Sequence, residues 1–398
     1  MNERFAALRR AIEGEPLPAA VVDLDAVDAN VGRLVRPVAL HGRTLRVATK
    51  SVRCPALLRH IAGAAAPVAR GFMCYSPGEA AFLWSEGLRD LLVAYPSTSR
   101  PELDALAKAN EAGADIAITA DEEAHLALAS RAATERGAQM RVLVDVDTAY
   151  RPLPGVVIGV QRSPLHAPDA IAAFAASISR FPGLSFGGIL AYEAHVAGLP
   201  DNVGVSPVRG HATLALKGRA HAAVVAQRAA IVRALAARGL AATIFNGGGS
   251  GSVETSAADP SLTEVAAGSG FLDSHLFDGY RGLPLVPAAF FVLQVTRRPR
   301  DGVVTCQSGG FIASGASGPS RSPVVAWPPG AKLTALEGAG EVQTPILTNH
   351  PLGLGDPVFL RHAKAGELAE HFNAYLLVRG DRIVDRARTY RGLGHAFH

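Results

Sequence analysis

The stretch Arg46-Val-Ala-Thr-Lys-Ser-Val-Arg-Cys-Pro55 is the one from which the fold of this chain is most readily worked out. The short, mainly apolar run Leu45–Ala48 predicts a β-strand, and Pro55 opens a helix-like segment. The strand therefore delivers Lys50 at its carboxyl end. An amine in that place is expected to be desolvated, which lowers its pKa and makes it nucleophilic enough to form a Schiff base. The alternative is an ordinary surface lysine at the mouth of a strand.

The same alternation of strand and helix repeats over the first two thirds of the chain. Eight short apolar runs show no polar–apolar alternation, which is typical of strands buried on both faces. Eight such strands with intervening helices predict an α/β protein with a (β/α)8 TIM barrel. A doubly wound α/β sheet has the same local pattern, and the count of eight favours the barrel. The predicted strands are Leu45–Thr49, Pro67–Met73, Leu91–Tyr95, Ala114–Thr119, Met140–Val146, Phe186–Ala191, Ala241–Phe245 and Thr263–Ala267. The predicted helices are Pro55–Ala62, Pro77–Glu86, Arg100–Ala112, Asp121–Arg136, Pro168–Arg180 and His211–Arg238.

The residue pattern changes after Gly279, where segments rich in β-branched residues and partly alternating in polarity are separated by Gly, Pro and Asp. This pattern predicts a second, all-β domain, and we expect the barrel domain to span residues 1–279 and the β domain 280–398. An earlier strand, Ala19–Leu24, with Asp25 as the cap of the following helix, could pair with the β domain. The predicted strands of the β domain are Ala288–Arg298, Gly302–Gln307, Pro323–Trp327, Lys332–Leu336, Asp356–Arg361 and a hairpin within Ala374–Arg386.

Composition and charge exclude several classes of protein. The formal charge is only +4 over 398 residues and the basic residues are scattered, so we expect no nucleic-acid partner. No apolar run is long enough to span a membrane, and residues 1–16 contain no signal-peptide core. The three cysteines, Cys54, Cys74 and Cys306, form a sparse and odd-numbered set. That set predicts reduced thiols in a cytoplasmic protein.

The strongest local motif is Asn246-Gly-Gly-Gly-Ser-Gly-Ser252, which follows a predicted strand. Consecutive glycines allow backbone N–H groups to surround an anion, and the serines add hydroxyl donors. A second glycine-rich turn, Ala267-Gly-Ser-Gly270, follows the next strand, and late barrel loops are the usual phosphate site of this fold. The motif is neither a P-loop nor a dinucleotide fingerprint, so it does not predict ATP or NAD. The alternative is a pair of flexible turns.

Other strand ends carry ionisable residues. Asp145-Val-Asp-Thr-Ala-Tyr-Arg151 places an arginine where it could hold a phenolate oxygen, or where it could simply pair with Asp147. Ala191-Tyr-Glu-Ala-His195 supplies a histidine that could act as a general base or be a hydrogen-bonded core residue. Arg361-His-Ala-Lys-Ala-Gly-Glu367 has four ionisable groups; on a strand His362 and Lys364 would point the same way, although a solvated face would explain the cluster as well.

Together these features resemble the fold-type III pyridoxal-phosphate enzymes. Within them the chain is similar to the D-threonine aldolase and D-serine dehydratase-like family, including its amino acid deaminase/aldolase branch, from Val22-Asp-Leu-Asp25 to Tyr390-Arg-Gly392. The resemblance implies an alanine racemase-type barrel and pyridoxal 5'-phosphate as cofactor, with Lys50 as the aldimine lysine. Arg151 and Tyr192 would contact the cofactor ring. The positions on the phosphate-binding turns are Gly248, Gly249, Ser250, Gly268 and Ser269.

The chain departs from the family pattern at two places. Members that use a divalent metal hold it with a histidine and, two residues later, a cysteine or aspartate, whereas the matching pair here is His362 and Lys364. An ammonium has no lone pair to donate, so no metal ligand set is predicted and a divalent metal is doubtful. A relocated site made by His362 with Glu367 or Glu341 is the alternative. The arginine common before the second turn is Ala266 here, so the pyridine nitrogen has no assigned partner.

The resemblance implies a lyase that acts on D-configured β-hydroxy amino acids. His195 or His362 would take the β-hydroxyl proton, and Cα–Cβ cleavage would release an aldehyde. Dehydration calls for an electrophile at the hydroxyl, so aldol cleavage is favoured, with Lys364 as a partial substitute for the metal. A homodimer is implied. The alternatives are an amino acid racemase of the same fold and a non-catalytic pyridoxal-phosphate-binding protein.

Overall fold

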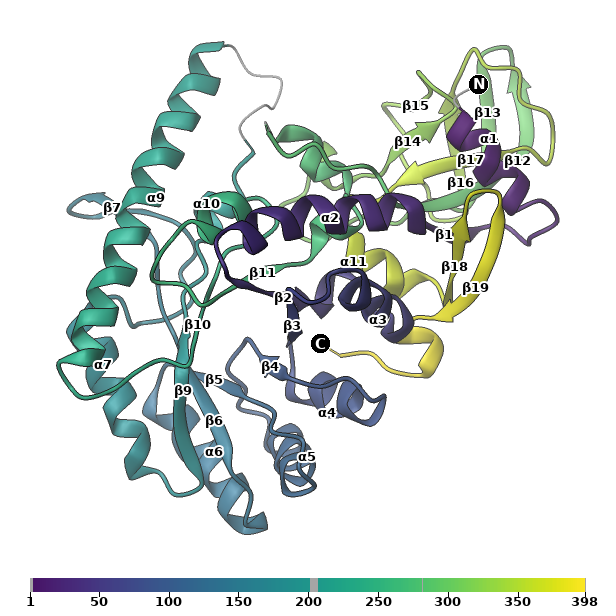
Figure 1. Cartoon of the computed structure of the whole chain (residues 1–398). Coiled ribbons are helices and arrows are strands. Elements are labelled where there is room, and N and C mark those ends of the chain that lie inside the picture. The colour runs from purple at the N-terminus through teal and green to yellow at the C-terminus, as the bar shows by residue number, and fades with distance from the viewer. Residues whose placement is uncertain (1–2, 201–206, 281, 398) are drawn as a thin grey trace. The chain divides into compact units, whose positions relative to one another are not determined.

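The computed structural model describes residues 3–200, 207–280 and 282–397, with side chains of the helix at 207–236 described from His211 onward. The chain divides into two compact units. The barrel unit comprises the described residues among 34–49 and 62–268 together with Phe397, and the β unit comprises the described residues among 1–33, 50–61 and 269–396. Each unit is described by itself, and Figure 1 labels their helices and strands.

The barrel unit is built on eight parallel strands in the order β4-β3-β2-β11-β10-β9-β6-β5. A parallel bridge between Leu92 and Ala117 joins the two ends of this order, so the sheet closes on itself. This closure confirms the predicted barrel and excludes a doubly wound sheet, which has two free edges. The eight strands are β2 (Thr44–Ala48), β3 (Ala69–Cys74), β4 (Leu91–Val93), β5 (Ile118–Ala120), β6 (Met140–Asp145), β9 (Leu184–Leu190), β10 (Ile244–Gly247) and β11 (Glu264–Ala267).

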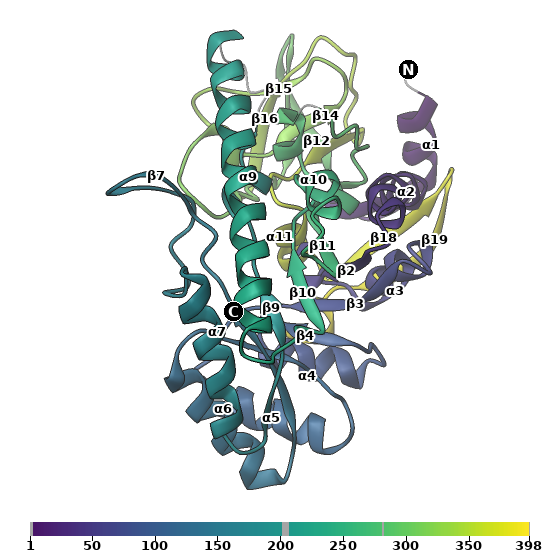
Figure 2. The same ribbon diagram turned by 60° about the vertical axis from the view of Figure 1, so that its left-hand side comes forward.

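Helices of the barrel unit begin and end where local chemistry favours it. At the start of α4, Ser76 Oγ accepts the Glu79 N–H at 3.2 Å and Pro77 takes the first helical position. At the end of α6, Gly137 adopts a left-handed conformation. Figure 2 shows the long helix α9 beside α7. The α-helices of the chain are α1 (Glu3–Ala11), α2 (Leu24–Leu40), α3 (Pro55–Ala64), α4 (Pro77–Ser85), α5 (Arg100–Glu111), α6 (Glu123–Arg136), α7 (Pro168–Ser177), α8 (Ala194–Ala197), α9 (Pro207–Ala236), α10 (Val253–Ala257) and α11 (Ala365–Leu368).

The β unit is organised around a mixed sheet in the order β15-β16-β13-β12-β1-β18-β19, with β17 pairing β12 and β14. The early strand β1 runs antiparallel to β12 and parallel to β18, which confirms that the N-terminal segment pairs with the later β strands. The expected helix cap is corrected: Asp23, not Asp25, accepts the N–H groups of Asp25 and Ala26 at 3.0 and 3.2 Å. The strands are β1 (Ala19–Asp23), β12 (Ala289–Arg300), β13 (Val303–Gln307), β14 (Val324–Trp327), β15 (Lys332–Leu333), β16 (Gln343–Leu347), β17 (Pro357–Arg361), β18 (Ala374–Arg379) and β19 (Arg382–Arg388).

Two strand features were not predicted. Strand β16 contains Pro345, and a proline in mid-strand argues against a strand because it cannot donate to the ladder. The structure accommodates it because the pairing with β15 stops at Leu333, before Pro345 is reached. The second feature is an antiparallel hairpin of β7 (Tyr150–Leu153) and β8 (Val156–Ile158) that projects from the barrel unit after β6.

One buried ionic network of the barrel unit is centred on Arg46. The Arg46 guanidinium donates to both carboxylate oxygens of Glu264, at 2.6 and 2.9 Å, and to Asp90 Oδ1 at 3.0 Å. Asn246 Nδ2 also donates to Glu264, at 2.7 Å. These contacts satisfy the buried charges, as buried ionised groups require. None of the described helices combines the length and apolarity needed to cross a bilayer.

Candidate functional site

The segment Gly247–Ser252, called the glycine loop below, begins at the last residue of β10 in the barrel unit. Packing explains why each of its first three residues is glycine. A Cβ at Gly247 would lie 2.5 Å from Arg228 Nη2, and one at Gly249 would lie 3.0 Å from the Tyr192 ring. Gly248 has φ +79°, and its Cβ would lie 2.6 Å from a Val265 methyl group. The loop therefore excludes side chains and leaves bare backbone.

A buried carboxylate organises the glycine loop. Glu193 follows Tyr192 after β9, and its side chain is completely buried. Its Oε2 accepts the Gly248 N–H at 3.0 Å and a hydrogen bond from Arg228 Nη2. Its Oε1 accepts the hydroxyl protons of Ser252, at 2.8 Å, and of Ser256. Four donors thus converge on one carboxylate, which is the number its two oxygens can accept.

The charge of Glu193 is balanced within the same cluster. Arg228, on α9, is also completely buried and donates through Nη1 to Asp259 Oδ2 at 3.1 Å. Burial alone would raise the pKa of Glu193, but the charge of Arg228 and the hydrogen bonds outweigh it and lower the pKa to about 2. Glu193 is therefore ionised at neutral pH. We call Glu193, Arg228, Asp259, Ser252 and Ser256 the Glu193 cluster.

The second predicted turn lies beside the glycine loop. Ser250 Oγ accepts the Gly268 N–H at 3.1 Å, which joins the loop after β10 to the loop after β11. The sequence predicted that the two turns come together, and the barrel unit brings them together. The expectation that Ser252 is an anion donor is wrong, because its hydroxyl proton goes to Glu193.

Arg151 lies on the hairpin strand β7 and forms the ion pair that the sequence left as an alternative. Its Nη2 lies 2.5 Å from Asp147 Oδ2, and its Nη1 lies 2.8 Å from His166 Nδ1. Gln227 Nε2 donates to the Asp147 and His166 carbonyls, both at 2.9 Å. Arg151 is exposed, so this network orients its guanidinium without burying it.

His195 lies on the short helix α8, in the same segment as Tyr192 and Glu193. Burial lowers the pKa of its imidazole, although the nearby carboxylates Glu193 and Asp147 act against this. Its Nε2 is buried and has no hydrogen-bond partner among the described residues. A neutral imidazole with an unused ring nitrogen can accept or donate one proton.

Lys50 lies in the 3₁₀ turn Thr49–Ser51 that follows β2. Its side chain is exposed, which corrects the expectation of a desolvated amine: the apolar residues end at Ala48, and it is Thr49 that is buried. Within the β unit the backbone of this turn is tightly held. A Cβ at Gly366 would lie 1.8 Å from the Lys50 carbonyl oxygen, and the hydroxyls of Ser51 and Ser269 are 3.0 Å apart.

His362 and Lys364 follow β17 instead of lying on it, so the expected strand geometry of this pair is wrong. His362 is buried, and its Nδ1 lies 2.5 Å from the Lys364 carbonyl oxygen. The same Nδ1 also lies 3.1 Å from the backbone nitrogen of Lys364, whose N–H only donates, so the two contacts do not fix which ring nitrogen carries the proton. Nε2 has no hydrogen-bond partner among the described residues. Burial lowers the pKa of His362 to about 4, so the ring is neutral at pH 7.

The Lys364 ammonium is held by two neighbours. Its Nζ lies 2.6 Å from Ser314 Oγ and 3.1 Å from Glu367 Oε1. Ser314 in turn donates to Glu367 through its N–H, at 2.7 Å, and through its hydroxyl. The ammonium is thus a fixed charge with its counter-ion beside it.

These residues do not fit a divalent metal. Within the described ranges, no three histidine, cysteine, aspartate or glutamate side chains lie close enough together to hold a metal ion. Glu367, which the sequence left as a possible ligand beside His362, is committed to Lys364 and Ser314. The Lys364 ammonium lies 3.1 Å from Glu367 Oε1 and would repel a metal cation bound by that carboxylate.

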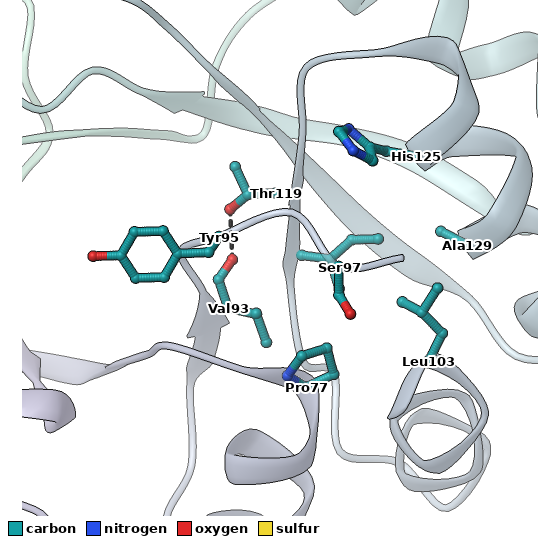
Figure 3. A pocket seen from close by; sticks show the side chains of 9 residues that line it. Pro77, Val93, Tyr95, Ser97, Leu103, Thr119, His125 and Ala129 are labelled. Carbon is teal, nitrogen blue, oxygen red and sulfur yellow. Dashed lines mark hydrogen bonds between the residues drawn. The ribbon is translucent and has the colours of Figure 1, made fainter. Parts of the chain in front are cut away.

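A small pocket lies elsewhere in the barrel unit, near the ends of β4 and β5 (Figure 3). Its lining is mostly apolar, and the Thr119 hydroxyl is used internally because it donates to the Val93 carbonyl. Ser97 Oγ donates to Glu102, which lies outside the lining. The pocket contains none of the predicted site residues, and we assign it no role. Its lining is Pro77, Val93, Tyr95, Ser97, Leu103, Ile118, Thr119, His125 and Ala129.

Sequence reasoning missed the partners of the glycine loop. Glu193 was visible as an acid beside His195, but nothing in its neighbourhood shows that it accepts the Gly248 N–H from 55 positions later. Arg228 lies in a long helix whose pattern resembles any surface helix, and Asp259 lies in a short connection. Only the closed barrel brings these residues to one point.

Comparison with known proteins gives consistent matches. A family model described as the N-terminal domain of alanine racemase matches residues 22–272. A D-threonine aldolase from Arthrobacter sp. is 28% identical over 334 residues, covering 81% of this chain and 80% of that protein. A 3-hydroxy-D-aspartate aldolase from Paracoccus denitrificans (strain Pd 1222) is 26% identical over 264 residues, covering 65% of this chain and 60% of that protein.

Solved structures match over almost the whole chain. A D-threonine aldolase from Filomicrobium marinum superimposes with a TM-score of 0.80 at 21% identity, covering 95% of both chains. A D-threo-3-hydroxyaspartate dehydratase from Delftia sp. HT23 superimposes with a TM-score of 0.74 at 20% identity, covering 95% of this chain and 98% of that one. At this level of identity the two matches establish the fold.

Proposed function

Because the chain belongs to the alanine racemase N-terminal domain family, as its sequence resemblance predicted, we propose that it is a pyridoxal-phosphate-dependent lyase of D-configured β-hydroxy amino acids. The observation that carries the proposal is the order β2-β11-β10 in the barrel. These three neighbouring parallel strands lead into Lys50, Gly268 and the glycine loop. A lysine and a phosphate cradle at adjacent strand ends are the two attachments that a phosphorylated aldehyde cofactor needs.

The residues present fit pyridoxal phosphate. The glycine loop is kept free of side chains by the packing of Arg228, Tyr192 and Val265, so that a phosphate could approach it closely. The N–H groups of Gly248, Gly249 and Gly268 are donated to Glu193, Ser252 and Ser250, so these glycines would contribute the shape of the cradle and its close approach rather than N–H donors. Ser250 and Gly268 join the loop to the second turn. We assign the phosphate to Gly248, Gly249, Ser250, Gly268 and Ser269, the cofactor ring to Arg151 and Tyr192, and the aldehyde carbon to Lys50.

The cofactor, when bound, would withdraw the electron pair that bond cleavage leaves on the substrate Cα. The chain's own residues would supply proton transfer and positioning. Retro-aldol cleavage requires a base that removes the proton of the β-hydroxyl, after which the Cα–Cβ bond breaks to give an aldehyde; a proton must then be delivered to Cα to give glycine. His195 and His362 are the two candidates, because each has a buried Nε2 without a partner among the described residues.

Lys364 would act as a fixed cation toward the substrate carboxylate or hydroxyl. Its ammonium is oriented by Ser314 and Glu367, which is the preorganisation that electrostatic stabilisation needs. An ammonium is a weaker electrophile than a divalent metal, and expulsion of a hydroxyl depends on such an electrophile. This difference favours carbon–carbon cleavage over ammonia-releasing dehydration, and the reaction would need no divalent metal.

A product assay tests the proposal. Purified protein with pyridoxal phosphate should release aldehyde and glycine from D-threonine or D-phenylserine and not from the L-isomers, both with and without a chelator. Release of keto acid and ammonia would identify a dehydratase instead. Interconversion of D- and L-isomers without aldehyde would identify a racemase, and no turnover with bound cofactor would indicate a non-catalytic binding protein.

We further propose that the protein is a cytoplasmic homodimer. The cytoplasmic assignment is supported by three cysteines that are all buried and unpaired, as expected in a reducing compartment. The dimer assignment rests on the family resemblance and on the need of barrel active sites for a cover that excludes water. Sedimentation combined with activity measurements tests it, and a fully active monomer would contradict it.

A further inference from the structure

We propose that Glu193 is the residue that positions the glycine loop, and that the Glu193 cluster gives the chain its preference for a phosphorylated cofactor over the same compound without phosphate. The inference deepens the proposed function and rests on it. It concerns positioning, because Glu193 donates no proton and its oxygens are used by Gly248, Arg228, Ser252 and Ser256.

The hydrogen bonds of Glu193 hold the loop at two points. One oxygen accepts the backbone N–H of Gly248, and the other accepts the hydroxyl of Ser252, so the backbone between them is held at both ends. Ser252 Oγ also accepts the Gly249 N–H at 3.2 Å. The short span Gly249–Gly251 is therefore given a defined shape by a side chain that belongs to a different barrel loop.

Arg228 and Asp259 keep this carboxylate ionised and in place. Without Arg228, a carboxylate with no solvent exposure would favour its protonated form and lose one of its four acceptor positions. Arg228 is itself fixed because it donates to the Ala191 carbonyl at 2.6 Å and to Asp259 at 3.1 Å. The same guanidinium occupies the space that a side chain at position 247 would need.

Electrostatics and positioning predict opposite results for one substitution. The charges of Glu193, Arg228 and Asp259 sum to −1, which on its own disfavours a bound phosphate. Glu193→Gln removes that negative charge but offers an amide that can accept from only one side. If charge decided phosphate affinity, this variant would bind the phosphorylated cofactor more tightly; if loop shape decides it, the variant binds more weakly.

The experiment compares two ligands. Apoprotein of wild type and Glu193→Gln is titrated with pyridoxal 5'-phosphate and with pyridoxal, and the ratio of the two dissociation constants is measured for each protein. We express this ratio as the Kd of pyridoxal divided by the Kd of pyridoxal 5'-phosphate. We expect it to be at least tenfold smaller in the variant than in wild type, which is a loss of about 1.4 kcal/mol of discrimination. A general loss of stability would weaken the binding of both ligands and leave the ratio unchanged.

Matched variants keep the test decisive. Glu264→Gln is the control, because Glu264 is also a buried carboxylate paired with a buried arginine, and its partners are Arg46 and Asn246. Its ratio should equal that of wild type. Ser256→Ala removes one hydroxyl donor to Glu193 and keeps the charge of the carboxylate, so it should lower the ratio by a smaller factor. This variant replaces Glu193→Gln in the test if Glu193→Gln does not fold.

The outcomes separate the two proposals. If wild type binds pyridoxal and its phosphate equally well, the assigned phosphate site fails, whatever Glu193 does. If wild type prefers the phosphate and Glu193→Gln keeps or increases that preference, the proposed positioning role is overturned. If only Ser256→Ala can be measured, a ratio equal to that of wild type overturns the positioning role of Glu193.

Discussion

Replacing Lys364 with aspartate should create a site that binds a divalent cation. In the wild type, the ammonium lies 2.6 Å from Ser314 Oγ and 3.1 Å from Glu367 Oε1. Lys364→Asp removes this cation, releases Glu367 from its ion pair, and places a carboxylate two residues after His362. The Nε2 of His362 is buried and has no partner among the described residues, so a neutral nitrogen ligand is already present.

The size of the effect follows from Coulomb's law. Two unit charges about 4 Å apart interact by about 4 kcal/mol at an effective dielectric of about 20, so a dication beside the Lys364 ammonium would be repelled by roughly 8 kcal/mol. That energy corresponds to between five and six orders of magnitude in affinity, at about 1.4 kcal/mol for each tenfold. Glu367 offsets much of the ammonium's charge, so this is an upper limit, and we expect Lys364→Asp to bind Mn²⁺ at least about a hundredfold more tightly than wild type does.

The assay uses chelated protein. Wild type, Lys364→Asp and Lys364→Ala are treated with EDTA, titrated with Mn²⁺ by calorimetry, and assayed for aldehyde release. Wild type should keep its activity after chelation, and the aspartate variant should bind Mn²⁺. Lys364→Ala removes the ammonium without adding a ligand: it should lose activity and keep the absorbance of the bound cofactor. Its Mn²⁺ affinity should rise above that of wild type because the repulsion is gone, and should stay below that of Lys364→Asp, which adds a carboxylate. Wild-type activity that disappears with chelator and returns with Mn²⁺ or Zn²⁺ would refute the reasoning.

Three further predictions concern other parts of the chain. Gly248→Val should raise the dissociation constant of pyridoxal phosphate at least about tenfold, because φ is +79° there and a Cβ has no room; unchanged affinity measured by titration would exclude the glycine loop as the phosphate site. Gly366→Ala should reduce turnover more than it reduces cofactor affinity, because its Cβ would overlap the Lys50 carbonyl; wild-type kinetics would show that the lysine turn tolerates displacement. Burial raises the pKa of Asp145 to about 7, so the stability it contributes is present at low pH and is lost as pH rises from about 4 through 7. Asp145→Asn should therefore become more stable relative to wild type by up to about 4 kcal/mol between pH 4 and 8, and a pH-independent difference in chemical denaturation would contradict this.

The barrel could be predicted because its strands are buried on both faces. All eight predicted runs overlap barrel strands, although Ala114–Thr119 shares only Ile118 and Thr119 with β5, and Ala241–Phe245 shares only Ile244 and Phe245 with β10. Strand β16 could not be predicted, because a proline in mid-strand lacks an N–H donor and argues against a strand. The structure tolerates Pro345 because the pairing with β15 ends before it. The division at residue 279 stays a prediction, since the compact units are assembled from several segments of the chain.

The parts of the candidate site that lie within one short sequence motif could be predicted. The glycine loop and the second turn were found from their glycines, and the structure joins them through Ser250 and Gly268. Glu193 and Arg228 were not found, because what they do depends on contacts between residues 31 or more positions apart. The burial of Lys50 was wrongly expected, because an apolar strand does not determine where the turn after it points its side chains.

The attachment of the cofactor to Lys50 is the central claim, and borohydride tests it most directly. The reagent fixes pyridoxal phosphate onto the lysine that holds it, and peptide mapping by mass spectrometry then identifies the residue. The account predicts a stoichiometric label on Lys50 and none on Lys364, and Lys50→Ala should remain unlabelled while keeping its fold. A label on any other lysine, or no label in protein that has bound the cofactor, would contradict the account.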